Sequence, residues 1–363
     1  MAANEMMRAA VLVREGDATD AIVVRDVPVP EPAADEVRVR VSHAALNHLD
    51  IWIRRGLPSV PKPRIMGADA AGWLDTPYPG SVDARMAANL AVGDRVLIDP
   101  GASCGSCPRC LAGDTALCRH FRVLGEHVDG TLAEYVVVPA SAVHPVPEHL
   151  DMEHAAALTL TFATAWRMLF TRAGAQPGER ALVWGASSGV GTAAIQLCAS
   201  SGIATLATTR SDAKVDALRA LGADHVVVSG TGHDAADRVL AAVAQAFGPD
   251  ALDVAFDHLG AAAWEPSMRA LARGGRYVTC GATTGAGPPA QITRLFWKQL
   301  SMLGSTMASR ADVADMLAFV RTHGIAPLID TSWPLADIHA AHHHLEAGAQ
   351  TGKVVISIAR DAN

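Results

Sequence analysis

The 363-residue sequence lacks several features that define other classes of protein. It has no run of about 18 apolar residues free of charge, so we expect no membrane-spanning segment. It has no excess of basic residues: the formal net charge is -7, which argues against nucleic acid or an anionic membrane as a partner. The opening residues, MAANEMMRAAVLV, lack a signal-peptide apolar core of adequate length, and we expect a cytoplasmic protein.

Cysteine is scarce, and its distribution argues against a disulfide framework. Four of the six cysteines form the pattern Cys104-x2-Cys107-x2-Cys110-x7-Cys118. Four thiolates at this spacing can surround one tetrahedral ion, which predicts Zn²⁺ or an iron–sulfur centre. Zinc is favoured because no proline follows Cys118 and no second set of cysteines is present. Four protein ligands leave no open position, so we expect one structural zinc per chain that orders a loop.

The first 150 residues are predicted to be rich in short β-strands. Strands are expected at 8–13, 36–42, 92–98 and 131–138, with prolines crowding the turns between them. The second of these strands alternates apolar and charged residues, as a strand with one solvated face should. This pattern is typical of a partly open barrel.

From about residue 151 the pattern changes to alternating strands and helices. A helix capped by Asp151 is expected to run to about Phe170. The strands expected after it are at 180–185, 204–208, 225–228, 252–256, 275–280 and 302–306, and the helices between and after them are at 190–201, 212–221, 234–247, 261–272, 291–300 and 311–322. This alternation predicts a doubly wound parallel sheet of six strands.

The closing segment is predicted to return to the first domain, because the strand at 352–358 has no helix after it. We therefore expect one domain from 1–152 and 325–363, and a second from 153–324. The triplet His342-His343-His344 is interpreted as a solvated helix face rather than a metal site.

The turn after strand 180–185 is suited to a dinucleotide. Residues 185–191, GASSGVG, fit G-x-G-x-x-G with Ala186 and Ser188 in place of the first two glycines. Small residues let the backbone approach a pyrophosphate, and the new helix points its unpaired N–H groups at it. An ordinary glycine-rich turn is the alternative. The predicted cofactor contacts are Ala186, Ser187, Ser188, Gly189, Val190 and Gly191.

The second strand of this unit ends without a carboxylate, which an NAD site would place on the ribose 2′-OH. Thr209, Arg210, Ser211 and Lys214 instead supply hydroxyls and positive charge that suit a 2′-phosphate, so NADP(H) is predicted. The alternative is that Arg210 and Lys214 are ordinary surface charges.

A later strand ends at Cys280-Gly281, and we expect these residues beside the nicotinamide, because ligands bind at the carboxyl ends of parallel strands. Cys198, in the middle of a predicted helix, is expected in the core.

Along nearly its whole length the chain resembles the medium-chain dehydrogenase/reductase family. The residues that carry the resemblance are Gly93-Asp94-Arg95-Val96, the four cysteines, Gly130-Thr131-Leu132-Ala133-Glu134-Tyr135, Gly185–Gly191 and Gly352-Lys353-Val354-Val355. The resemblance implies an α/β fold in which a GroES-like, β-rich catalytic domain is interrupted by a Rossmann domain. It also implies that the four cysteines hold the structural zinc of the alcohol-dehydrogenase branch.

That branch has a catalytic zinc as well, and the matching positions here lack its ligand types. The first ligand position is Asn47, the second lies in the triplet Gly67-Ala68-Asp69, and the third falls near Leu160 or Thr161. An alternative set of zinc ligands is His48, Asp50 and Asp69. It would make the chain a zinc-dependent alcohol or aldehyde dehydrogenase with unusual ligands.

The pattern Asn47-x2-Asp50 is similar to the quinone-oxidoreductase branch. This implies hydride transfer from NADPH to a small-molecule substrate, either a quinone or an α,β-unsaturated carbonyl compound. The catalytic candidates are Asn47 and His48 as donors to the developing negative charge, with Asp50 orienting either one. Asn47 and Asp50 are alternatively a helix N-cap and a first-turn acid. His48 alternatively binds the cofactor pyrophosphate.

The resemblance further implies that Lys353 binds the cofactor. It also implies a homodimer or homotetramer joined around Met302–Thr306. A third hypothesis is that the chain is a non-enzymatic relative that senses a cofactor or binds RNA. The acidic net charge argues against RNA binding.

Overall fold

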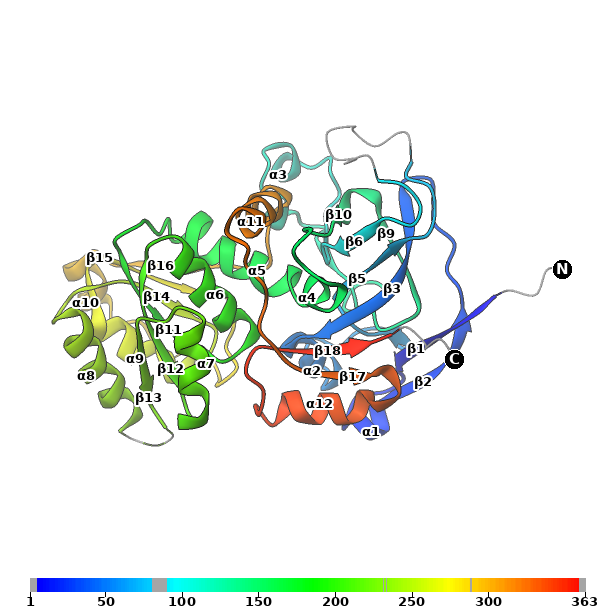
Figure 1. Ribbon diagram of the computed structural model, residues 1–363. Coiled ribbons are helices and arrows are strands. Elements are labelled where there is room, and N and C mark those ends of the chain that lie inside the picture. The colour runs from blue at the N-terminus through cyan, green and yellow to red at the C-terminus, as the bar shows by residue number, and fades with distance from the viewer. Residues whose placement is uncertain (1–4, 80–89, 231, 233, 288, 359–363) are drawn as a thin grey trace. The chain divides into compact units, whose positions relative to one another are not determined.

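The computed structural model describes residues 5–79, 90–230, 232, 234–287 and 289–358. The chain forms two compact units, drawn in Figure 1: unit 1 contains Met1–Leu160 and Ser309–Asn363, and unit 2 contains Thr161–Ala308. The sequence places the boundaries at 152/153 and 324/325, whereas the chain leaves unit 1 at 160/161 and re-enters it at 308/309. Helix α11 (Arg310–His323) is therefore part of unit 1.

Unit 1 is built on two mainly antiparallel sheets. Within the described residues, the small sheet has the order β2-β1-β4, and the large one has the order β10-β6-β5-β3-β18-β17 with β9 also pairing with β3. The strands of the small sheet are β1 (Met6–Leu12), β2 (Ile22–Pro28) and β4 (Arg64–Ile65). The strands of the large sheet are β3 (Glu36–Leu46), β5 (Asp69–Leu74), β6 (Arg95–Ile98), β9 (Tyr135–Pro139), β10 (Val143–Pro145), β17 (Ile329–Pro334) and β18 (Lys353–Ser357).

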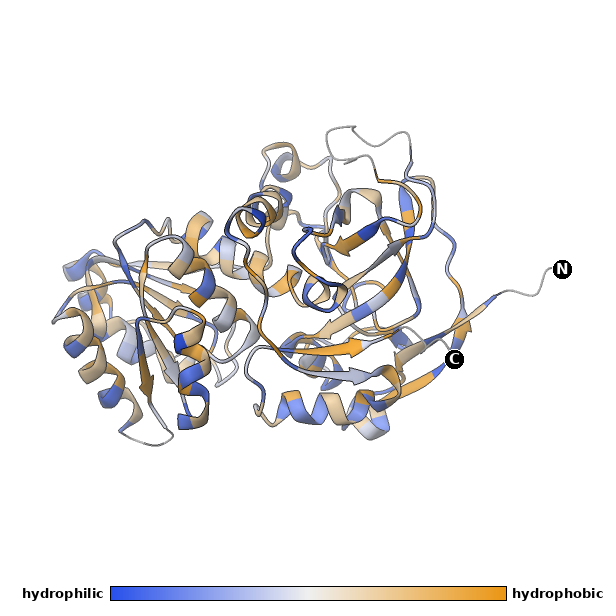
Figure 2. Cartoon of the chain, in the orientation of Figure 1, coloured by the Kyte–Doolittle hydropathy of each residue, from blue (hydrophilic) through white to orange (hydrophobic). Residues whose placement is uncertain are grey.

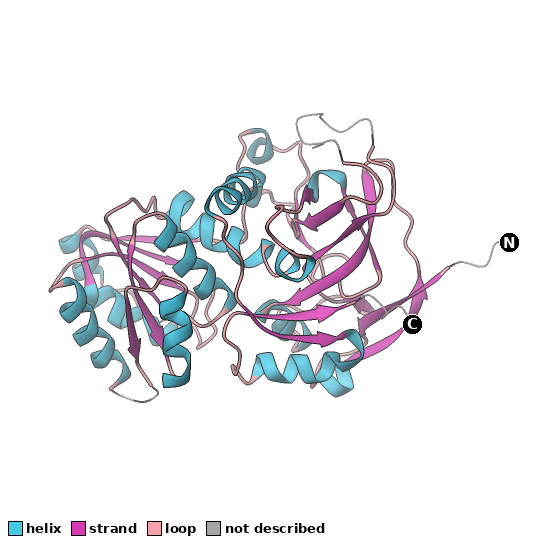
Figure 3. Ribbon diagram, viewed as in Figure 1, coloured by secondary structure: helices cyan, strands magenta, loops and turns pink. Residues whose placement is uncertain are grey.

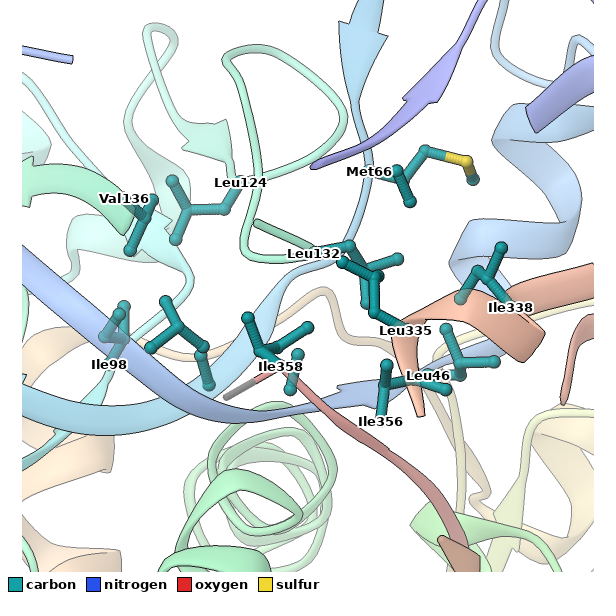
Figure 4. Packing of buried hydrophobic residues seen from close by; sticks show 14 of the residues in the cluster. Leu46, Met66, Ile98, Leu124, Leu132, Val136, Leu335, Ile338, Ile356 and Ile358 are labelled. Carbon is teal, nitrogen blue, oxygen red and sulfur yellow. The ribbon is translucent and has the colours of Figure 1, made fainter. Parts of the chain in front are cut away.

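Strand β18 joins the last described part of the chain to the first domain, as predicted. It runs antiparallel to β3, with Val354 opposite Leu46 and Ile356 opposite Ala44. Most of β18 is hydrophobic in Figure 2, and its valines and isoleucine are fully buried. The side chains of Val354 and Ile356 join the large core, and Figure 4 shows Leu46, Ile356 and Leu335 packed together in it. Burial of each such side chain contributes about 1.5–3 kcal/mol to the stability of this unit.

The helices of unit 1 are short, except for α11. They are α1 (Ala18–Ala21), α2 (His48–Arg54), α3 (Pro108–Leu111), α4 (Met152–Ala156), α11 and α12 (Ile338–Glu346). Helix α12 carries the histidine triplet, and the interpretation as a solvated face is wrong for its first member. His342 has 0% exposure, while Nε2 of His344 lies 2.8 Å from Asp330 Oδ2. A helix in contact with a core must turn one residue in three or four inward, and His342 occupies that position.

Unit 2 contains the predicted six-stranded parallel sheet, in the order β13-β12-β11-β14-β15-β16 within the described residues. Its strands are β11 (Arg180–Val183), β12 (Ala204–Thr209), β13 (His225–Val228), β14 (Leu252–Asp257), β15 (Leu271–Thr279) and β16 (Ser301–Gly304). Its helices are α6 (Gly189–Ser200), α7 (Val215–Ala220), α8 (Ala235–Phe247), α9 (Ala261–Ala270) and α10 (Ile292–Lys298). Figures 1 and 3 show helices on both faces of this sheet. The order is that of a Rossmann fold, which confirms the predicted fold class.

The single helix expected from Asp151 to about Phe170 is interrupted. Asp151 caps α4 by accepting from the His154 N–H, as predicted, but α4 ends at Ala156 and a separate helix, α5 (Thr159–Trp166), follows. The Leu160 N–H donates to the side chain of Asp69 at 2.8 Å and not to a helical carbonyl. A π-helical segment, Arg167–Arg172, follows α5. The break thus leaves a free helix N-terminus that Asp69 caps.

No helix among the described residues is long and apolar enough to cross a membrane.

Candidate active site

The turn between β11 and α6 has the geometry of a phosphate-binding loop. Ser188 is the N-cap of α6, and its hydroxyl accepts the Gly191 N–H at 3.0 Å. The turn is fixed to the neighbouring strand β12, since the N–H of Gly185 donates to Thr208 Oγ1 at 3.1 Å and that of Ala186 to Thr208 O at 3.0 Å. The first residues of a helix have backbone N–H groups without helical partners, and these are suited to an anion.

Two glycines of this turn are required by its backbone. Gly185 has φ of +57°, a conformation that other residues seldom adopt. A Cβ atom on Gly191 would lie 2.6 Å from Gly185 O and 2.7 Å from Ala186 Cα, so a larger residue would push α6 off the turn. Gly191 therefore lets α6 pack closely against the turn.

Strand β12 ends in hydroxyl and basic residues, as the sequence indicates. Thr209 is buried and its Oγ1 accepts the N–H of Ser211 at 3.3 Å, whereas Arg210 is exposed. Lys214 is half-buried at the end of a short 3₁₀ turn. The end of the strand thus presents a cation and hydroxyls, with no acidic residue between Thr208 and Ser211.

The carboxyl ends of β14 and β15 supply further groups on the same sheet edge. Cys280 and Gly281 follow β15 and are half-buried, and the Cys280 N–H donates to Asp257 O at 3.3 Å. His258, which the sequence analysis did not select, lies with Nε2 3.1 Å from Ser188 Oγ. Its position directly after strand β14 is the signal that could have identified it, because ligands of such sheets bind at strand carboxyl ends. Cys198 is fully buried, as expected.

Cys104, Cys107, Cys110 and Cys118 lie in the segment between β7 (Gly101–Ala102) and β8 (Arg122–Val123), here called the cysteine lobe. Their side chains converge on one point. Their sulfur atoms all lie within 4.8 Å of one another, with separations of 3.5 Å between Cys107 and Cys110 and 3.9 Å between Cys104 and Cys110. Four sulfurs placed about 2.3 Å from one zinc ion would be separated by about 3.8 Å. The donor set and its spacing therefore fit a tetrahedral zinc.

Backbone N–H groups around the lobe favour the thiolate form of Cys104, whereas burial raises the pKa of Cys110. The N–H groups of Ser106 and Cys107 lower the pKa of the Cys104 thiol to about 5. Cys118 Sγ accepts from the N–H of Cys104 at 3.5 Å and from that of His120 at 3.3 Å. These donors point at the sulfur atom of Cys118, an arrangement suited to negative charge there.

A second group of polar side chains, here called the buried polar centre, lies in unit 1 and consists of Asn47, Asp50, Asp69 and Lys353. The four are 0–6% exposed. The ammonium of Lys353 donates to Asn47 Oδ1 at 2.6 Å and to Asp69 Oδ2 at 3.0 Å. The segments around Asn47, Asp69 and Leu160, which the sequence resemblance assigns to one catalytic centre, thus lie together in this unit.

The amide of Asn47 is fully engaged inside the protein. Its Nδ2 donates to Asp69 Oδ2 at 3.0 Å and to Ala45 O at 3.3 Å, while its Oδ1 accepts from Lys353. In this arrangement neither amide hydrogen is left for a substrate. His48, the other predicted donor, is exposed and packs edge-on against Trp52, with ring centroids 5.2 Å apart.

Asp50 has the local role that the sequence analysis gave as its alternative. It is the third residue of α2, and its two carboxylate oxygens accept the N–H of Asn47 at 2.8 Å and that of Gly67 at 3.2 Å. Burial raises the pKa of Asp50 to about 6, and the two backbone donors oppose that shift. Asp50 therefore ties the start of α2 to the Gly67 turn.

Glycine and threonine residues quoted for the family resemblance support this centre. A Cβ atom on Gly352 would lie 2.2 Å from Leu328 O, so only glycine lets the chain approach β17 just before Lys353. Gly67, with φ of +94°, and Thr131, whose hydroxyl donates to Asp69 O at 2.9 Å, hold Asp69 in place.

The meeting of Lys353 with Asn47 and Asp69 was not predicted, because the three residues are separated by up to 306 positions. The return of strand 352–358 was predicted from its apolar pattern, but the register that brings its first residue beside Asn47 is not readable from periodicity. Among the described residues, the four cysteines are the group of His, Cys, Asp and Glu side chains that could share one metal. The alternative set of His48, Asp50 and Asp69 does not form such a group there.

Comparison with known proteins agrees with this architecture. The alcohol dehydrogenase GroES-like domain family matches residues 33–148, and the zinc-binding dehydrogenase family matches residues 189–322. A crotonyl-CoA carboxylase/reductase from Cereibacter sphaeroides is 31% identical, over 91% of this chain and 81% of its own length.

Two solved structures are also similar over almost the whole chain. An NAD-dependent alcohol dehydrogenase is 42% identical, with a TM-score of 0.88, over 97% of this chain and 100% of its own. A 2-octenoyl-CoA carboxylase reductase in complex with NADP and 2-octenoyl-CoA is 26% identical, with a TM-score of 0.89, over 99% of this chain and 90% of its own. The chain therefore belongs to the medium-chain dehydrogenase/reductase family and is an oxidoreductase of that family.

Proposed function

We propose that this oxidoreductase uses NADPH to reduce an activated alkene, and that its substrate class is an α,β-unsaturated thioester. The observation that carries the proposal is the buried polar centre, in which Lys353 bridges Asn47 and Asp69. Reduction of a double bond conjugated to a carbonyl builds negative charge on the carbonyl oxygen, and a fixed cation or hydrogen-bond donor stabilises that charge.

The relatives favour the alkene branch of the sequence prediction over quinones. The similar proteins described above include a crotonyl-CoA carboxylase/reductase and a reductase with 2-octenoyl-CoA bound, and both names specify α,β-unsaturated thioesters. Within the predicted catalytic set, His48 is exposed and is kept as a second donor, while Asn47 and Asp50 position the centre through their hydrogen bonds.

The preference for NADPH rests on the end of β12. Arg210 is exposed beside Thr209 and Ser211, where an NAD site would carry a carboxylate. A guanidinium can bind a 2′-phosphate through charge-assisted hydrogen bonds. The cofactor residues proposed from the sequence, Ala186–Gly191 and Cys280-Gly281, lie at the carboxyl ends of the strands of the same sheet.

The four cysteines are proposed to hold one structural zinc per chain. When bound, the ion would be coordinated by Cys104, Cys107, Cys110 and Cys118 and would order the lobe between β7 (Gly101–Ala102) and β8 (Arg122–Val123). Four thiols kept free for a metal require a reducing compartment, in keeping with the cytoplasm expected from the sequence.

The test is a direct assay of the purified protein with crotonyl-CoA and either NADPH or NADH, followed by the loss of reduced-cofactor absorbance. We expect NADPH-dependent turnover, and we expect Arg210→Ala to raise the KM for NADPH by about tenfold or more because a charged hydrogen bond is lost. Arg219→Ala, which removes an exposed arginine on α7, is the matched control. Equal KM values for NADPH and NADH in the unaltered protein would contradict the cofactor assignment.

An alcohol dehydrogenase is the second candidate, and the 42% identity to an NAD-dependent alcohol dehydrogenase favours it. It requires a metal at an open site with three protein ligands. Two tightly held zinc ions per chain, together with oxidation of primary alcohols by NAD, would support it against the enoyl reductase.

A further inference from the structure

Protein groups accept two of the three hydrogen bonds that the Lys353 ammonium can donate. An ammonium carries three N–H donors, and two of them go to Asn47 Oδ1 and Asp69 Oδ2. Within the described part of the chain, no third protein acceptor lies within hydrogen-bond distance of Nζ. The nitrogen is nevertheless held firmly, since both acceptors are themselves buried and hydrogen-bonded.

The two acceptors, Asp69 and Asn47, are held in place by hydrogen bonds to other protein groups. Asp69 Oδ1 accepts the N–H of Leu160 at the start of α5, and its Oδ2 accepts from Asn47 as well as from Lys353. Asn47 uses its remaining amide hydrogen on Ala45 O. Of the side chains that meet at this point, Lys353 is the one with a donor left over.

We propose that Lys353 is the catalytic cation of the reaction, and that its third N–H donates to the carbonyl oxygen of the substrate. Asp69 and Asn47 are positioning residues that aim the ammonium. This inference rests on the proposed function and gives a residue and an atom to the charge stabilisation that the function requires. It departs from the sequence prediction that Lys353 binds the cofactor.

The chemistry balances with one hydride and one proton. When bound, NADPH supplies the hydride. Addition of hydride to the β-carbon breaks the carbon–carbon π bond and moves that electron pair toward the carbonyl oxygen, which becomes an enolate oxygen. The Lys353 N–H strengthens its hydrogen bond to that oxygen as the charge develops. A proton taken up from solvent water then adds to the α-carbon, the carbonyl re-forms, and the saturated thioester and NADP⁺ are the products.

The burial of Lys353 makes its charge effective. Its side chain is 3% exposed, so water screens it little. The same burial makes the single substitution Lys353→Met costly, because the Asp69 carboxylate loses its cation, and removing one partner of a buried ion pair costs about 3–5 kcal/mol. The double variant Lys353→Met with Asp69→Asn removes both charges of this ion pair, so Asp69 is not left as an unpaired carboxylate, while Asp50 keeps its two backbone donors.

The first experiment measures kcat and the KM for NADPH with crotonyl-CoA in the double variant and in Lys353→Met. We expect kcat to fall by about 10²–10³-fold, as for loss of one oxyanion donor, with the KM for NADPH little changed. Lys353→Arg, which keeps a cation, should recover part of the loss. Lys298→Met removes the lysine paired with Asp250 in unit 2 and is the control expected to keep full activity.

The second experiment needs no turnover. Acetoacetyl-CoA, a β-keto thioester, forms an enolate that absorbs in the near ultraviolet. It is titrated with the protein in the presence of NADP⁺ across a range of pH. The unaltered protein should bind the enolate and lower the apparent pKa of the ligand, and the double variant should lose this shift.

These readouts distinguish the two proposals. If the unaltered protein stabilises the enolate but does not reduce crotonyl-CoA, the role of Lys353 stands and the proposed substrate class fails. A double variant with kcat within about threefold of the unaltered protein, or one that still stabilises the enolate, would overturn the role of Lys353. So would a loss confined to the KM for NADPH, which would return Lys353 to the cofactor.

Discussion

The buried residue His342 should make the free energy of unfolding of this protein depend on pH. It is fully buried on α12, and both ring nitrogens lack a hydrogen-bond partner among the described residues. Burial lowers the pKa of His342 to about 3, and the nearby Arg54 adds to the shift. The folded state therefore holds a neutral imidazole, whereas the unfolded chain binds a proton below about pH 6.5.

The stability of unit 1 should consequently fall as the pH drops from about 6.5 toward 3. At pH 5 this one residue should lower the free energy of unfolding by about 2 kcal/mol relative to pH 7.5. His342→Leu should remove that part of the pH dependence. The measurement is urea unfolding at both pH values, with His323→Gln, which replaces an exposed histidine on α11, as the control. An unchanged pH dependence in His342→Leu would show that His342 does not carry it.

Residues whose role is local were predictable, and residues whose role depends on distant partners were not. The turn at 185–191 and the four cysteines lie within short stretches, so spacing alone indicated their geometry. Asn47 was selected as a catalytic donor, which stays a prediction, and the use of its amide by Ala45 and Asp69 was not predicted because it depends on strand register. His342 was misjudged because a polar triplet gives no sign of which face is turned inward.

At the scale of elements, the cysteine lobe contains little regular secondary structure that could hold it in place without a metal. It contains only a four-residue helix, a short 3₁₀ turn and the two-residue strands β7 and β8. Such a segment buries too little apolar surface to order itself, so its order should depend on the metal.

Cys107→Ser should therefore lose the zinc and loosen the lobe. We expect the zinc content to fall from one ion per chain to nearly none, with faster proteolysis between residues 103 and 121. Elemental analysis and limited proteolysis measure the two effects. Cys198→Ala, in the core of unit 2, should keep its zinc, and a Cys107→Ser protein that also keeps its zinc would contradict the assignment.

Elements were predicted well where the chain alternates strand and helix, because periodicity and turn residues act over short distances. The helix expected from Asp151 to about Phe170 was the main exception. Nothing in its apolar sequence indicates that Asp69, 91 positions away, takes the Leu160 N–H and starts a new helix there.

For the whole molecule, strand β16 is an edge of the six-stranded sheet and bears exposed apolar side chains. Met302 is 44% exposed, and Phe296 and Trp297 on α10 are 63% and 68% exposed. An unpaired strand edge with apolar neighbours is a natural site for pairing with a second copy. The homodimer or homotetramer implied by the family resemblance stays a prediction, and this edge is where it can be tested.

Met302→Lys should weaken that assembly, since a lysine on an edge strand opposes edge-to-edge pairing. Light scattering after size-exclusion chromatography should show a smaller mass than that of the unaltered protein. Val23→Lys, at an exposed site on edge strand β2, should leave the mass unchanged. A monomeric unaltered protein would dismiss the expectation altogether.

The insertion of unit 2 between the two segments of unit 1 has a consequence for biosynthesis. Lys353 is translated after the entire Rossmann sheet, yet its partners Asn47 and Asp69 are translated before that sheet. Until β18 arrives, Asp69 lacks the Lys353 cation, and the Ala44–Leu46 end of β3 lacks its neighbour on the side away from β5. A nascent chain can thus complete the nucleotide-binding sheet first, while the polar centre can close only after strand β18 has been made.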